Sequence, residues 1–229
     1  MALNLKAKGQ QTSSISVSSE GADVYVRAMR DGTLLQMPWL TAKAIEGKVF
    51  AAHVGLMTTP TTFSPTIDAA MPDLLVTVPS GTTIIPVYLS VGFEDTGAAQ
   101  VLDVFACASS VYDNSVTGTA NVIQNMRTDK PVGGSQCTAY SVVTANGTDP
   151  ESGNYVEFWR PLAGFGEDGF NGSTAPTNNQ VSFSKWSIGD CVVPPVIVGN
   201  GSLNVYAAAQ AGTGYIVAIW VEEPSANLI

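Results

Sequence analysis

The chain has little of the chemistry on which most enzymes and metal sites depend. Its 229 residues include one histidine, His53, and three cysteines, Cys107, Cys137 and Cys191. A single histidine excludes a multi-histidine metal site of the cupin kind. The cysteines are odd in number and widely spaced, which argues against a disulfide framework or a zinc knuckle and favours buried reduced thiols. We predict no metal and no cofactor.

Short catalytic motifs are also missing from the sequence. A G-x-S-x-G motif does not occur, and the nearest string, GGSQC at residues 133–137, lacks the final glycine. Neither a phosphate-binding P-loop nor a dinucleotide fingerprint before a helix is present. His53 lies among apolar residues in a strand pattern, where a structural role is more common than a catalytic one. We therefore predict that the protein is not an enzyme.

Charge is scarce and unevenly distributed. Charged residues make up 13% of the chain and hydrophobic residues 45%, and the formal net charge is −9. Residues 1–50 carry six bases and four acids, whereas residues 51–229 carry four bases and fifteen acids. An acidic body repels nucleic acid and anionic membranes, so we expect direct contact with neither. In the leading segment, Lys6 and Lys8 are candidate contact residues.

Long hydrophobic runs are absent. The first ten residues contain no apolar run of signal-peptide length, and no stretch approaches the roughly 18 apolar residues of a membrane span. We expect the chain to be made and kept in the cytosol until a later assembly or release.

Period-two alternation and short apolar runs recur, whereas helical periodicity is nearly absent. The predicted strands are 23–27, 49–58, 74–78, 83–93, 101–111, 120–126, 137–144, 155–159, 180–187, 191–198, 202–209 and 215–222. So many short strands predict an all-β fold, a jelly-roll-like antiparallel β-sandwich. We expect an extended N-terminal arm over residues 1–22 and a single domain over 23–229, with a long loop insertion at about 145–180.

Turn residues predict several connections. The pair Asn200-Gly201 between two apolar runs is a hairpin signal. The last two strands are expected to form a hairpin through residues 210–214. Because proline cannot donate to a strand ladder, Pro86 predicts an edge or a bulge in its strand.

Aromatic residues gather near the predicted insertion. Phe165 and Phe170 lie among Gly, Glu and Asp and are hard to bury within a strand, so they are candidate contacts with a ligand or another subunit. Trp159 is a further candidate contact. The alternative, which we favour for the strand aromatics, is a role as core anchors; these are Phe158, Trp159, Phe183 and Trp186.

Carboxylates cluster in the same region at Asp149, Glu151, Glu157, Glu167 and Asp168. Two of them facing one another would suit a glycosidase. With Asn154 and Asn171, the set also has the oxygen ligands that Ca²⁺ prefers, although the spacing does not match an EF-hand. Solvated loop acids are the more common case.

Two segments resemble jelly-roll strands of virion proteins of bacterial viruses. They are VPSGTTIIPV at residues 78–87, with its P-x-G-T element, and the final pair GSLNVYAAA at 201–209 and YIVAIWVEE at 215–223. The resemblance implies a capsid-surface, decoration or minor shell protein, assembled in the host cytoplasm into the virion. It also implies a homo-oligomer, a trimer, with other virion proteins as partners. The chain departs from tailed-phage shell proteins, which have a long spine helix, and from small RNA viruses with a strongly basic arm.

Three functions remain open from the sequence. The first is a structural protein that self-associates in a capsid. The second is a receptor- or carbohydrate-binding tail or fibre module that uses the 145–180 loops. The third is a glycoside-processing enzyme on a sandwich scaffold.

Overall fold

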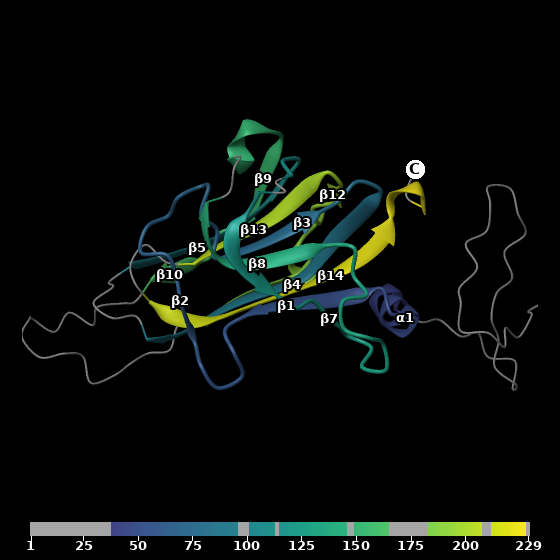
Figure 1. Ribbon diagram of the computed structural model, residues 1–229, viewed down its shortest axis with the longest axis horizontal. Coiled ribbons are helices and arrows are strands. Elements are labelled where there is room, and N and C mark those ends of the chain that lie inside the picture. Colours follow the sequence, from purple (N-terminus) through teal and green to yellow (C-terminus); the bar gives the residue numbers. More distant parts are fainter. Residues whose placement is uncertain are drawn as a thin grey trace, which may run out of the picture.

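Two antiparallel β-sheets stack face to face and enclose the core (Figure 1). This computed structural model describes residues 38–95, 101–112, 115–145, 149–164, 183–207 and 212–227. The predicted all-β sandwich is confirmed. The predicted arm, the strand 23–27 and much of the 145–180 insertion lie outside the described residues.

The first sheet has the order β11-β4-β14-β1-β7, with β12 on β4 and β2 on β14. Its strands are β1 (Val49–Val54), β2 (Thr61–Thr62), β4 (Thr82–Asp95), β7 (Gln124–Asn125), β11 (Phe183–Ser187), β12 (Ile197–Val198) and β14 (Thr213–Pro224).

The second sheet has the order β10-β5-β13-β3-β8-β6, with β9 also on β5. Its strands are β3 (Leu74–Val78), β5 (Val101–Ser109), β6 (Thr117–Asn121), β8 (Thr138–Ala145), β9 (Tyr155–Trp159), β10 (Leu162–Gly164) and β13 (Gly201–Ala207).

The order of the main strands is that of a jelly roll. Along the chain, β1, β4, β11 and β14 lie in the first sheet in the order β1-β14-β4-β11. The strands β3, β5, β9 and β13 lie in the second sheet in the order β3-β13-β5-β9. This pair of interleaved four-stranded sheets is the two-Greek-key arrangement of jelly rolls. Within the described chain, β6, β7, β8 and β10 extend it at the margins.

The core lies between the two sheets and follows the predicted alternation. Ile216, Ala218 and Trp220 of β14 are fully buried, as are Leu203 and the other inward residues of β13. Apolar side chains at alternate positions of a strand share one face. That face meets the opposite sheet in each case.

The bulge predicted at Pro86 is confirmed. In the ladder between β4 and β14, Ile219 pairs with Tyr88 and Trp220 pairs with Pro86, so Val87 is the extra residue. The bulge turns Val87 outward, where it packs with Val49 and Val221 beneath the helix α1 (Trp39–Glu46).

The helix α1 was not predicted from the sequence. It ends at Gly47, whose φ of 75° is the left-handed conformation that favours glycine at a helix C-terminus. Leu40 and Ala44 of the helix cover the small apolar cluster on the outer face of the first sheet. No helix in the described ranges has the length and hydrophobicity that crossing a membrane requires.

Two predicted hairpins are wrong. β13 and β14 lie in different sheets, β13 between β3 and β5 and β14 between β1 and β4. Asn200-Gly201 likewise joins β12 of the first sheet to β13 of the second, and neither residue has a positive φ. An alternating pattern identifies the face that meets the core. It does not identify the sheet, because both sheets direct apolar faces inward.

Several strand boundaries also differ from the predictions. Residues 55–58 leave the sheet after β1, and the predicted strand 120–126 is split between β6 and β7. Of the predicted strand 191–198, only Ile197–Val198 pairs with a neighbour. The prolines Pro194 and Pro195 account for the loss of pairing there, because they have no N–H to donate.

Candidate interaction surface

One margin of the first sheet is formed by two short strands and the turn between them. β11 pairs with β4 over residues 88–92, and β12 pairs with the same strand over residues 83–84. Within the described ranges no strand pairs with the opposite side of β11 or β12. The segment 191–198, CVVPPVIV, therefore lies at an open margin of the sandwich, and we call it the valine edge.

Most apolar side chains of the valine edge point into solvent. Val192 and Val193 are 102% and 80% exposed, and Val196 and Val198 are 54% and 53% exposed. Ile197 faces the other way, is 3% exposed and joins the core. Single exposed hydrophobic residues are common on proteins, whereas a run of them on one segment is a candidate interaction site.

The turn before the valine edge is anchored by side chains. The indole N–H of Trp186, a buried residue, donates a hydrogen bond to the Cys191 Sγ at 2.9 Å. The Asp190 carboxylate accepts from the backbone N–H and the hydroxyl of Ser187 at 3.1 and 2.7 Å, which caps the 3-10 helix η2 (Ile188–Asp190). An apolar surface that is already ordered loses little conformational entropy when it binds.

Two adjacent prolines interrupt the backbone donors of the valine edge. Pro194 and Pro195 lack N–H groups, and a strand that adds to a sheet edge needs such donors. A further strand could therefore not pair with the backbone at these two positions, where only side-chain contacts are available.

The margin is electrically neutral in an acidic protein. Residues 183–200 contain one base, Lys185, and one acid, Asp190, whereas the whole chain has a net charge of −9. Both charged side chains are exposed. Copies of an acidic protein repel one another least where their surfaces carry no net charge.

The aromatic residues near the predicted insertion divide between core and surface. Trp159 is 8% exposed and belongs to the core, which fits its alternative role as an anchor and leaves little of it for a surface contact. Phe158 packs edge-to-face on Trp186 with ring centroids 5.0 Å apart. Phe183 is 58% exposed on β11, so its predicted role as a core anchor is wrong.

Several predicted residues lie outside the described ranges. They are Lys6, Lys8, Phe165, Glu167, Asp168, Phe170 and Asn171. The structure therefore bears on neither the basic pair of the arm nor the central aromatics of the insertion.

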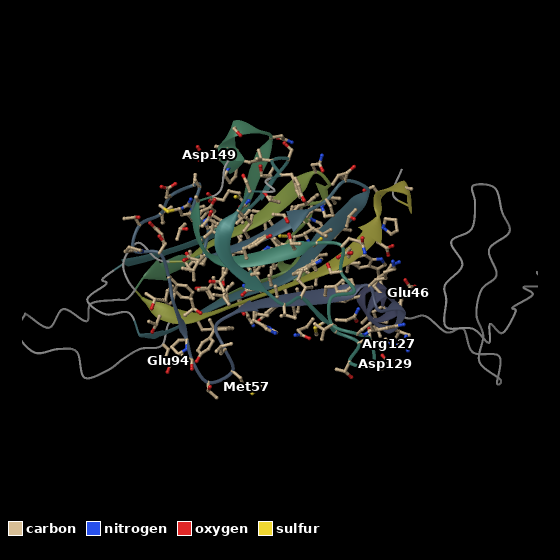
Figure 2. All side chains as sticks on the ribbon, in the orientation of Figure 1. Glu46, Met57, Glu94, Arg127, Asp129 and Asp149 are labelled. Atoms are coloured by element: carbon tan, nitrogen blue, oxygen red, sulfur yellow. The ribbon has the colours of Figure 1, made fainter. Side chains whose placement is uncertain are left out.

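The described carboxylates of the insertion have structural partners. Asp149, on the loop beside β9 (Figure 2), accepts a hydrogen bond from the Glu151 backbone N–H at 2.8 Å and caps the 3-10 helix η1 (Pro150–Ser152). Glu157 forms an ion pair with Arg160 at 2.6 Å, and the hydrogen bond from that guanidinium lowers the pKa of Glu157. His53 is exposed on β1. Among the described residues, no group of three or more His, Cys, Asp or Glu side chains is arranged to hold a metal ion.

A cleft of about 400 Å³ opens beside the end of α1, and its acids are engaged by the protein itself. Glu222 accepts hydrogen bonds from the Ser135 hydroxyl at 2.5 Å and the Gln136 backbone N–H at 2.8 Å. Glu223 forms an ion pair with Lys43 at 2.5 Å. Burial lowers the pKa of Lys43, but its carboxylate partners outweigh burial and raise it. These contacts tie the end of β14 to its neighbours.

A buried carboxylate, Asp73, joins β3 to the end of β13. Its two oxygens accept hydrogen bonds from the backbone N–H groups of Ser64 and Ala207, each at 2.7 Å, and its own N–H donates to Val205. Asp73 is 4% exposed, and burial raises its pKa to about 7 in spite of the two amide donors. The position makes it a structural, pH-sensitive residue of the second sheet.

The three cysteines are free thiols, as predicted. Cys107 and Cys137 are buried and Cys191 is half-buried. Burial raises the pKa of Cys107 to about 12, and it also raises that of Cys137. Thiols with raised pKa values are poor nucleophiles at neutral pH.

The sequence pattern predicted an ordinary strand at the valine edge. Two signals in the sequence distinguish it: adjacent prolines inside the run, and apolar residues at both odd and even positions. In a half-buried strand, apolar and polar residues alternate. An uninterrupted apolar run at a sheet margin therefore leaves the apolar side chains of one face exposed to solvent.

Comparisons with known proteins match this chain to no family model, no curated protein and no solved structure.

Proposed function

We propose that the chain is a non-enzymatic structural subunit that associates with copies of itself in a virion capsid, as a shell or decoration protein. The observation that carries the proposal is the valine edge. The side chains of Val192 and Val193 are exposed to solvent. The Trp186–Cys191 hydrogen bond and the cap of η2 fix the turn that precedes them. Burying such side chains against another protein is favourable by the hydrophobic effect.

The jelly-roll strand order supports this function without deciding it. Viral capsid subunits and lectins both use the fold, so fold alone does not assign a function. The exposed side chains of the valine edge are aliphatic, whereas a sugar site needs polar groups and aromatic faces. The aliphatic character favours a protein partner.

The charge distribution supports a position on the protein shell and away from the genome. Residues 51–229 carry four bases and fifteen acids. A surface of that sign repels phosphate.

Two measurements test the proposal. Sedimentation velocity of the purified chain over a wide concentration range should show discrete oligomers. Mass spectrometry of particles from the source should find the chain as a major component in fixed ratio to the other shell proteins. A chain that stays monomeric at every concentration would refute the proposal, and so would its absence from particles or the turnover of a glycan by the monomer.

A further inference from the structure

The margin of the first sheet carries two charged side chains, Lys185 and Asp190, that form no ion pair with any described residue. Lys185 of β11 is exposed and forms no hydrogen bond or ion pair with any described residue. Asp190 is exposed at the end of η2, where one carboxylate oxygen, Oδ2, accepts both capping hydrogen bonds from Ser187. Its other oxygen has no partner among the described residues.

We propose that two copies of the chain meet edge to edge across a two-fold axis, so that Lys185 of each copy faces Asp190 of the other. The proposal rests on the self-association proposed above and names the surface that produces it. A two-fold contact brings the same patch of both subunits together, so the patch must be complementary to itself. One cation and one anion on a short segment meet that requirement.

The apolar side chains of the margin fit the same arrangement. Phe183 lies two residues before Lys185 and Val192 lies two residues after Asp190, so these two side chains flank the charged pair on the same margin. Phe183 and Val192 are 58% and 102% exposed, and the contact would bury both. Aromatic and aliphatic side chains at the centre of an interface supply much of its affinity.

A second copy suits this surface because the margin is neutral. Residues 183–200 carry one base and one acid, so two chains of net charge −9 approach there without bringing excess acids together. Lys185 and the two prolines of the valine edge also protect the margin against uncontrolled strand addition. The contact therefore joins two copies and no more, and it is made by side chains. It is separate from the three-fold axis that the resemblance to virion proteins implies.

The test compares charge and apolar variants of the full chain with matched controls by sedimentation velocity. Lys185→Glu should weaken pairing, while Lys130→Glu, an exposed lysine on another loop, makes the same change in net charge and should not. Val192→Asp/Val193→Asp should also weaken pairing, whereas Val122→Asp/Val132→Asp, at valines that are 56% and 62% exposed elsewhere, should not. We expect the dissociation constant to rise at least about thirtyfold, the effect of losing an interface hot spot. Circular dichroism confirms that each variant is folded.

The outcomes separate this contact from the general proposal of self-association. A wild-type chain that is monomeric overturns both. A wild-type chain that associates while both edge variants associate equally well overturns the edge contact alone. Equal weakening by the edge variants and by their controls also overturns it, because the effect would then come from added negative charge.

Discussion

Replacing Asp73 by asparagine should remove a pH dependence from the stability of the protein. In the folded chain burial raises the pKa of this carboxyl to about 7, whereas its ordinary value is 3.8. Between these two values the folded state holds the proton more tightly than the unfolded state does. The free energy of unfolding therefore falls as the pH rises through this window, and the loss is complete above the folded pKa.

The size of the effect follows from the difference between the two pKa values. A group that is 4% exposed and shifted this far contributes on the order of 4 kcal/mol across the window. The asparagine side chain of the variant does not titrate. It also leaves either the Ser64 or the Ala207 N–H without its acceptor, a cost of about 1 to 3 kcal/mol that does not vary with pH.

The assay is urea unfolding, followed by tryptophan fluorescence, from about pH 4 to pH 8. The stability of the wild-type chain minus that of Asp73→Asn should decrease steadily up to neutral pH and then level off. Asp68→Asn is the matched control, because Asp68 lies in the same loop and is exposed. A difference that stays constant from about pH 4 to pH 8 would refute the reasoning. It would mean that the two amide donors hold Asp73 ionised throughout.

Three further predictions concern packing and surface charge. Gly214→Ala should destabilise the fold by about 1 to 3 kcal/mol in thermal unfolding, because the added methyl group would overlap the Gly92 carbonyl oxygen. Gly134→Ala is the control and should change little, because a methyl group there lies 3.7 Å from its nearest neighbour, the Pro131 carbonyl oxygen. Trp159→Ala should cost about 3 to 5 kcal/mol in urea unfolding as the loss of a core side chain; an effect below about 1 kcal/mol would contradict that role. Glu157→Gln should change the free energy of unfolding by less than about 1 kcal/mol, because the ion pair between Glu157 and Arg160 is solvent-exposed. A larger loss in the same assay would show that this ion pair stabilises the fold.

The strand content could be predicted because period-two alternation directly reflects a sheet with one buried face. Residues 74–78 and 155–159 have the predicted boundaries, and the bulge at Pro86 follows from its missing N–H. The helix α1 was missed because eight residues give a weak periodic signal. Its two covering residues, Leu40 and Ala44, can be recognised as a buried face only when the apolar cluster beneath them is known.

The candidate site was harder to predict than the fold. Sequence reasoning named Trp159 as a candidate contact while favouring a core role for it, and Trp159 lies in the core. Exposure of the valine edge depends on which residues reach the sandwich interior. Ile197 does so and Val196 and Val198 do not, a distinction that the apolar run alone does not contain.

The sequence by itself determined that the chain forms short strands with apolar inner faces, little charge and free thiols, because these properties depend on composition and on neighbouring residues. Only the tertiary structure decided which sheet each strand joins, where the sheet margin is left open and which carboxylate is buried. Strand pairing joins residues far apart in the chain, such as Leu74 with Val205, and the sequence around either partner does not identify the other.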